Sequence, residues 1–192
     1  MSNRPIDTAS FRSIQKASEI LFKGKVLVFP TDTVYGIGCL PKEKAIRKLY
    51  KIKNRPLNQP TAILFSKKLY KLLDTKVKSQ TPKNIYKDFQ KGKITLILPK
   101  SQIKFNFPNI ILKDETIGLR IPKNVWLQKL IDVVGPIVAS SANKRGERAP
   151  KKFAGISQDI IEGADLVVKI EKSLSGEPSA VYDLACQKYL RQ

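Results

Sequence analysis

The chain has 192 residues, enough for one domain with a full hydrophobic core, and its hydrophobic content of 42% excludes general disorder. It contains no histidine and two cysteines, so we expect no disulfide scaffold, no typical zinc site and no histidine-based acid–base catalysis. No apolar run approaches the roughly 20 residues that span a bilayer, and residues 1–5 lack the apolar core of a signal peptide. We therefore expect a cytoplasmic protein.

The charge of the chain is strongly positive. Lys and Arg number 36 against 16 Asp and Glu, a net charge of +20. Residues 41–104 alone carry 18 basic and 3 acidic side chains, a net charge of +15. A field of this sign attracts polyanions such as tRNA, and nucleotides as well. Because Lys outnumbers Arg 28 to 8, compositional drift explains the same excess, and charge alone leaves both interpretations open.

The predicted elements alternate between helices and strands. Helical spacing of apolar residues predicts helices, in chain order, over residues 11–21, 42–52, 67–73, 82–89 and 125–134. Short apolar runs predict strands over residues 26–29, 62–65, 94–98, 116–121, 137–139, 166–170 and 180–184. The alternation is too regular for an all-β fold and is not strictly βαβ. We expect one α/β domain, residues 1–192, with a twisted sheet of parallel and antiparallel strands.

The first predicted strand ends in a loop rich in hydroxyl groups. Residues 31–35 (Thr-Asp-Thr-Val-Tyr) place two hydroxyls, a carboxylate and a phenol directly behind the strand, and Gly36 and Gly38 follow them. Strand ends in α/β proteins commonly present ligand groups. Taken alone, these residues fit a capped strand-to-helix turn as well as they fit a ligand site.

Three cationic residues stand out against the lysine-rich background. Lys53 and Arg55 precede Pro56, which disfavours helix at Arg55, so the two side chains can point toward one anion. Arg120 lies inside an apolar strand, where an unpaired cation is costly. We therefore expect an anionic partner for Arg120, either a ligand or an Asp or Glu in a structural ion pair.

Two further loops carry polar groups next to predicted strands. Residues 140–143 (Ser-Ser-Ala-Asn) follow a buried strand, with Lys144, Arg145 and Arg148 close behind, and backbone N–H groups in such a turn can meet an anion. Residues 176–179 (Gly-Glu-Pro-Ser) precede the last strand. Each loop alone is structural as readily as functional. Neither the P-loop pattern nor the complete dinucleotide fingerprint occurs, so a nucleotide would be bound by a different device.

Taken in order, these motifs resemble the YrdC/TsaC family, the threonylcarbamoyl-AMP synthases. The resemblance rests on residues 30–36, Lys53-x-Arg55-Pro56, Arg120-x-Pro122, Ser141-Ala142-Asn143 and Gly176-x-x-Ser179, and runs over nearly the whole chain. It is similar to the short, single-domain bacterial form. The resemblance implies an α/β fold with a twisted mixed sheet and a large basic concave cavity.

The resemblance also implies an activity. L-threonine, bicarbonate or CO₂, and ATP would form threonylcarbamoyl-adenylate and pyrophosphate in a nucleotidyltransferase reaction, for threonylcarbamoyladenosine modification of tRNA. A separate downstream complex would transfer the threonylcarbamoyl group. The implied catalytic residues are Lys53, Arg55, Ser141 and Asn143, which with Arg148 would meet ATP, while Thr31, Thr33, Arg120 and Ser179 would meet threonine. Because the sequence shows no acidic cluster, we expect Mg²⁺ to arrive with ATP.

The chain departs from the family pattern in its final segment, residues 179–192, which matches only at its start, and at two places before it. Lys91-Gly92-Lys93 replaces the usual Pro-Gly-Pro turn before Thr95, and Arg145 and Arg148 replace small residues. Two alternatives remain: an RNA-binding module that uses residues 41–104 without ATP turnover, and a carbamoyl-adenylate enzyme with another acceptor. The basic region also leaves direct contact with tRNA open.

Overall fold

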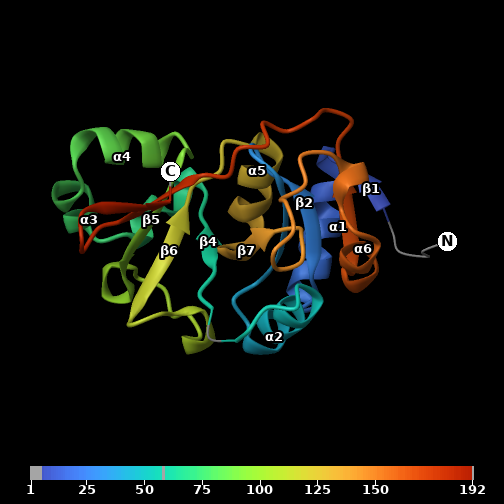
Figure 1. The fold of residues 1–192 in the computed structure, drawn as a ribbon, viewed down its shortest axis with the longest axis horizontal. Helices are drawn as coiled ribbons and strands as arrows, with labels where there is room; N and C mark the ends of the chain where they lie inside the picture. Colours follow the sequence, from blue (N-terminus) through green and yellow to red (C-terminus); the bar gives the residue numbers. More distant parts are fainter. Residues whose placement is uncertain (1–5, 58, 192) are drawn as a thin grey trace.

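The computed structural model describes residues 6–57 and 59–191, and within them one ten-stranded sheet is flanked by helices (Figure 1). The strands are β1 (Ile6–Thr8), β2 (Leu27–Pro30), β3 (Tyr35–Cys39), β4 (Ala62–Leu64), β5 (Ile94–Pro99), β6 (Thr116–Arg120), β7 (Ile137–Ser141), β8 (Leu166–Lys169), β9 (Ala180–Asp183) and β10 (Lys188–Arg191). The α-helices are α1 (Phe11–Phe22), α2 (Glu43–Ile52), α3 (Thr75–Gln80), α4 (Lys83–Gln90), α5 (Val125–Val134) and α6 (Gln158–Gly163). The expectation that the N-terminus is not a signal peptide concerns residues 1–5, which lie outside this range.

The sheet is mixed, which confirms the predicted fold class. Its strand order is β1-β8-β2-β3-β7-β4-β6-β5-β9-β10. Strand β8 runs parallel to both β1 and β2, and β4 runs parallel to β6. Strands β2, β3, β7 and β4 are successively antiparallel. Figure 1 shows β1 and β2 with α1 and α6 at one end of the molecule, and β5 with α3 and α4 at the other.

The loop after β2 leads into strand β3, so of the two interpretations that the sequence left open, the capped strand-to-helix turn does not apply. Residues 31–34 connect β2 to β3, and the two strands pair antiparallel. Gly36 and Gly38 lie in β3, and they are glycines because the neighbouring atoms leave no room for a side chain at either position. A Cβ atom at Gly38 would lie 2.7 Å from the Val138 carbonyl oxygen, and one at Gly36 would lie 3.0 Å from the Phe29 ring. Close packing, rather than a turn, requires both glycines.

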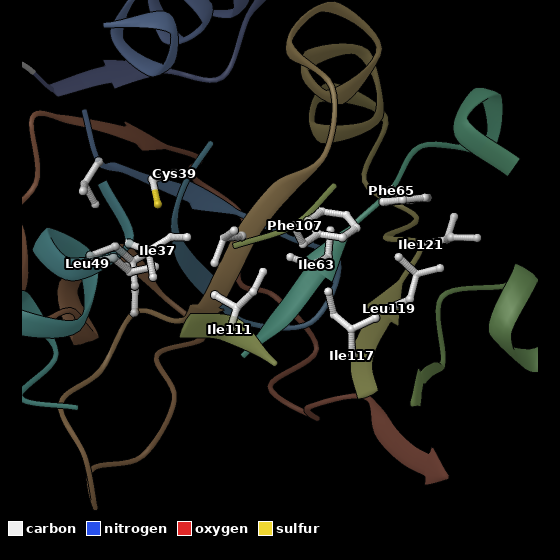
Figure 2. Close-up of a cluster of buried hydrophobic side chains, with 14 of the residues drawn as sticks. Ile37, Cys39, Leu49, Ile63, Phe65, Phe107, Ile111, Ile117, Leu119 and Ile121 are labelled. Carbon is white, nitrogen blue, oxygen red and sulfur yellow. The ribbon is translucent and has the colours of Figure 1, made fainter. Parts of the chain in front are cut away.

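Alternating side chains divide the core into two layers. Val26 and Val28 belong to the layer on one face of the sheet, shown in Figure 2 around Ile63. Leu27 and Phe29 belong to the layer on the opposite face, which includes residues of α1 and α5. This alternation follows from the two-residue period of a strand, with both faces buried. No helix within residues 6–57 and 59–191 is long and apolar enough to cross a membrane.

A long coil joins β8 to β9 across the width of the sheet. It is hydrogen-bonded to Tyr35 of β3 and to the loop that precedes β3. The hydroxyl of Tyr35 accepts a hydrogen bond from the Ile170 N–H (3.0 Å) and donates one to the Ile170 carbonyl (3.3 Å). The Gly176 N–H donates to the Thr33 carbonyl (2.8 Å). Tyr35 therefore has a structural role, and the coil brings Ser179 against Thr95 of β5.

Candidate functional site

A cavity of about 610 Å³ lies on the face of the sheet that also carries α1 and α5. Cross-strand partners share one face, and the registers pair Ala62 with both Gly118 and Ala139, and Arg120 with Thr95. These residues form the floor of the cavity. Several of them are small, so the strands leave a hollow where larger side chains would fill the space. The volume falls in the range of about 300–1,000 Å³ typical of small-molecule sites.

The cavity gathers most of the predicted site residues. Those that line it are Thr31, Thr33, Arg55, Arg120, Ser141, Asn143 and Ser179. They come from the β2–β3 loop, the segment after α2, strands β6 and β7, and the coil before β9. Strand pairing therefore brings together groups that lie more than 140 residues apart in the sequence.

Arg120 has the anionic partner that the sequence predicts. Its Nη2 donates to Asp32 Oδ2 (3.0 Å), and its Nε donates to the Gly92 carbonyl (3.2 Å). The side chain is only 9% exposed, and it still lines the cavity. Burial lowers the pKa of Arg120, and the charge of Asp32 opposes that shift. The ion pair fixes the guanidinium at the cavity wall.

Gly92 keeps the tight turn although its neighbours depart from the family pattern. Its φ is +74°, and a Cβ atom there would lie 2.5 Å from the Ile121 carbonyl oxygen. Only glycine fits this position, because the backbone is left-handed and a second chain segment lies against it. The turn thus holds the Gly92 carbonyl where it accepts a hydrogen bond from Arg120 Nε.

Lys53 lies behind the loop that follows β7. It is 4% exposed, and its Nζ donates to the carbonyl oxygens of Ser141 and Asn143. Burial, followed by repulsion from Arg55, lowers the pKa of Lys53 to about 8. Lys53 does not line the main cavity but a smaller one beside it. It therefore orients the Ser141–Asn143 loop as well as supplying charge.

Arg55 lies between the two cavities and lines both. Its guanidinium donates to the carbonyl oxygens of Gln59 (3.4 Å) and Pro60, and its Cζ lies 5.6 Å from the centre of the Tyr50 ring. Backbone acceptors and an aromatic face hold an arginine without neutralising its charge. Arg55 can therefore still meet an anion.

The second cavity, of about 210 Å³, adjoins the first along the Ser141–Asn143 loop. Its lining carries four cations, Lys53, Arg55, Lys144 and Arg145, and no carboxylate. Its volume, about a third of that of the main cavity, suits a small anion such as phosphate better than a nucleoside. Lys144 is paired with Asp159 and Arg145 is exposed.

Hydroxyl groups at the main cavity bond mostly to the protein itself. Thr31 Oγ1 donates to the Val34 carbonyl (2.7 Å) and accepts from the Thr33 N–H (3.0 Å), which closes the β2–β3 turn. Ser179 Oγ and Thr95 Oγ1 lie 2.9 Å apart. Asn143 Nδ2 donates to the carbonyl oxygens of Lys144 and Glu147, while its Oδ1 is buried with no partner among the described residues.

Sequence reasoning missed two cations that line the main cavity, Lys113 and Arg191. Arg191 lies in β10 and donates from Nη2 to the Ser179 carbonyl (2.7 Å). Neither residue belongs to a motif, and in a chain with 36 basic residues no local signal separates them from solvent-facing cations. Conversely, Arg148 lines neither cavity.

The cavity offers cations rather than metal ligands. Its lining includes Arg55, Lys113, Arg120 and Arg191 against one carboxylate, Glu147. Within residues 6–57 and 59–191, no three His, Cys, Asp or Glu side chains are grouped to hold a metal ion. Arginine forks match phosphate and carboxylate oxygens, so this donor set suits an anionic ligand.

The fold and the cavity thus define an α/β protein with a cationic small-molecule site. Comparison with known proteins gives its family. The sequence model of the family described as Sua5_yciO_yrdC, telomere recombination, matches residues 19–192. The chain belongs to this Sua5/YciO/YrdC family.

Individual relatives agree with this assignment. A protein from Methanocaldococcus jannaschii is 32% identical over 171 residues, which covers 88% of this chain and 79% of the relative. A Bacillus subtilis protein named threonylcarbamoyl-AMP synthase is 32% identical, covering 84% of this chain and 49% of the relative. The crystal structure of Pyrococcus abyssi Sua5 complexed with L-threonine is 28% identical with a TM-score of 0.78, covering 95% of this chain and 54% of Sua5. The chain thus spans about half the length of the last two.

Proposed function

We propose that this protein is an L-threonylcarbamoyladenylate synthase, which joins L-threonine, bicarbonate or CO₂ and ATP and releases pyrophosphate. The observation that carries the proposal is the cationic cavity that holds seven of the nine predicted site residues, in a family whose B. subtilis relative is named for this activity. The P. abyssi Sua5 structure with L-threonine supports threonine as the amino-acid substrate.

The chemistry accounts for the composition of the site. The threonine amine adds to CO₂ and releases a proton to solvent to give a carbamate, and a carbamate oxygen then attacks the α-phosphorus of ATP. The bond from that phosphorus to the bridging oxygen breaks, and pyrophosphate leaves with the electron pair. Two anions must approach each other, so the site needs cations and preorganised donors more than a protein nucleophile.

The proposed roles follow from position. Arg55, between the two cavities, neutralises charge at the reacting phosphate, and Lys53 and Arg145 face the β- and γ-phosphates in the smaller cavity. Ser141 would donate to a phosphate or ribose oxygen, and Asn143, whose Nδ2 hydrogens already bond to two carbonyls, would accept from a ribose hydroxyl through Oδ1. The threonine would lie near Thr31, Thr33, Arg120 and Ser179, with its carboxylate at a cation. Mg²⁺ would enter as the ATP complex, held by phosphate oxygens.

The wider setting belongs to the same proposal. Residues 1–192 would act as one YrdC-like domain in the cytoplasm, as a nucleotidyltransferase whose product passes to a separate threonylcarbamoyl-transfer complex for tRNA modification. The excess of basic residues within residues 41–104 would allow contact with tRNA.

Pyrophosphate release tests the proposal directly. Release from ATP should require both L-threonine and bicarbonate, so omission of either should reduce it to background. Release that ignores both omissions would contradict the proposed reaction. An RNA-binding module instead predicts no turnover, with tRNA binding that weakens steeply with salt.

A further inference from the structure

Asp32 lies in the most recognisable motif of the chain, yet the proposed reaction gives it no role. It occupies the β2–β3 loop between Thr31 and Thr33, both of which line the main cavity. Its Oδ2 accepts from Arg120 Nη2 at 3.0 Å, across 88 positions of sequence. The two side chains are 17% and 9% exposed, so the pair is shielded from solvent.

The hydrogen bonding of the Asp32–Arg120 ion pair is incomplete, unlike that of a buried ion pair that stabilises a fold. Asp32 Oδ1 is buried and has no hydrogen-bond partner among the described residues. A buried carboxylate that leaves one oxygen unpaired offsets its desolvation poorly. Buried groups with incomplete hydrogen bonding need an explanation, and functional sites are where such cost is tolerated.

Arg120 is held by only some of the N–H groups of its guanidinium. Asp32 takes one Nη2 hydrogen and the Gly92 carbonyl takes the Nε hydrogen. Of the five N–H groups of a guanidinium, three then have no partner among residues 6–57 and 59–191. Arg120 lines the cavity, so these donors are available to a ligand there.

Asp32 also opposes the effect that a second cation, Arg191, has on Arg120. Arg191 lines the same cavity, and its charge, after the effect of burial, contributes to the lowered pKa of Arg120. Without Asp32, Arg120 would keep the neutral Gly92 carbonyl as its anchor while facing Arg191. Like charges in a poorly solvated cavity repel strongly, so the guanidinium would turn or shift.

We infer that Asp32 is a positioning residue, which holds Arg120 so that its free N–H groups meet the carboxylate of the amino-acid substrate. The inference rests on the proposed function, because it takes L-threonine as the ligand of Arg120. The acidic position of the β2–β3 loop thereby orients the group that binds the carboxylate, without touching the substrate.

The test measures equilibrium binding of L-threonine and of L-threoninamide, which lacks the carboxylate, by calorimetry on the full chain. The wild-type protein should prefer L-threonine. Asp32→Asn should weaken L-threonine binding by about tenfold or more, the scale of one charge-assisted hydrogen bond, and should reduce the threonine-to-threoninamide ratio by a similar factor. ATP binding should change by less than about twofold in the same variant.

Asp165→Asn is the matched control. Asp165 also accepts from a lysine and a backbone N–H, with an 11% exposed side chain, but lines neither cavity. It should lower the melting temperature and leave the threonine-to-threoninamide ratio unchanged. Asp32→Glu, which keeps the charge on a longer side chain, should retain part of the ratio and serves if Asp32→Asn does not fold.

The outcomes distinguish the proposed substrate from the positioning role. Failure of the wild-type protein to bind L-threonine would contradict the proposed substrate itself. Wild-type binding together with an unchanged ratio in folded Asp32→Asn would overturn the positioning role. Loss of the fold in both Asp32 variants, with Asp165→Asn still folded, would overturn it too, because the pair would then be a stability element.

Discussion

At the scale of single residues, three cations near the β7 loop differ in what holds them. Lys53 is buried against carbonyl oxygens, Arg55 is held by carbonyls and an aromatic ring, and Arg145 is exposed. A buried lysine ammonium is oriented by its partners but loses its proton more readily than one in water, because burial disfavours the charged form. Arg55 and Lys53 therefore give different predictions.

Arg55→Ala should abolish pyrophosphate release while the protein stays folded. The side chain is half-buried in a loop, so its loss should change the melting temperature little, whereas the phosphate loses a cation in both cavities. Turnover measured with all three substrates should fall at least about a hundredfold below wild type. Arg12→Ala, which removes an equal charge from an exposed position of α1, should turn over normally. Normal turnover in folded Arg55→Ala would remove Arg55 from the reaction.

Lys53 should make ATP binding sensitive to pH. Its pKa is lowered to about 8, so the ammonium group loses its proton as the pH rises through about 8, and attraction for phosphate is lost with it. The affinity for ATP, measured without threonine, should therefore fall between about pH 7 and pH 9. In Lys53→Met the affinity should be lower than that of the wild type at about pH 7 and approach it at about pH 9, and this pH dependence should vanish. A pH dependence that survives in Lys53→Met would belong to another group.

At the scale of elements, pairing and close approach decide what local sequence does not. Helix α1 ends within one residue of the predicted end, and Gly24, at φ +71°, is its C′ residue, because helix periodicity and capping are local signals. Strand β3 was not predictable in this way, because Gly36 and Gly38 are typical of turns. Their presence in a strand depends on Phe29 and Val138, which lie beside them only in the folded sheet.

The turn before β5 gives a prediction at this scale. Gly92→Ala should destabilise the protein more than Gly24→Ala, since both residues have positive φ but only Gly92 has a neighbour, the Ile121 carbonyl, within 2.5 Å of the added Cβ. The strain alone costs about 1–2 kcal/mol, and the overlap adds to it. Chemical denaturation of the two variants compares the free energies of unfolding. Equal losses would show that the backbone at Gly92 moves away without cost.

At the scale of the whole molecule, the net charge of +20 is the dominant feature. Self-repulsion of like charges destabilises a compact state, and salt screens it. An inert salt raised from about 10 mM to about 150 mM shortens the Debye length from roughly 30 Å to about 8 Å.

The melting temperature should therefore rise by about 2 °C or more over this range of salt. A variant with four exposed lysines of α3 and α4 changed to Gln should show a smaller rise; the positions are Lys76, Lys78, Lys83 and Lys87. An unchanged or lower melting temperature in salt would mean that the positive charges are already compensated in the fold.

The sequence by itself determined the α/β class, the mixed sheet, most helices and long strands, and the motif residues Arg55, Arg120, Ser141 and Asn143 as candidates, because periodicity and motif spacing are local properties. Only the tertiary structure decided which charges meet. It paired Arg120 with Asp32, buried Lys53 behind the β7 loop, and brought Arg191 into the cavity. Charge pairing across a sheet depends on the order of its strands, so Asp32 and Arg120, 88 positions apart in the sequence, become neighbours only when the sheet forms.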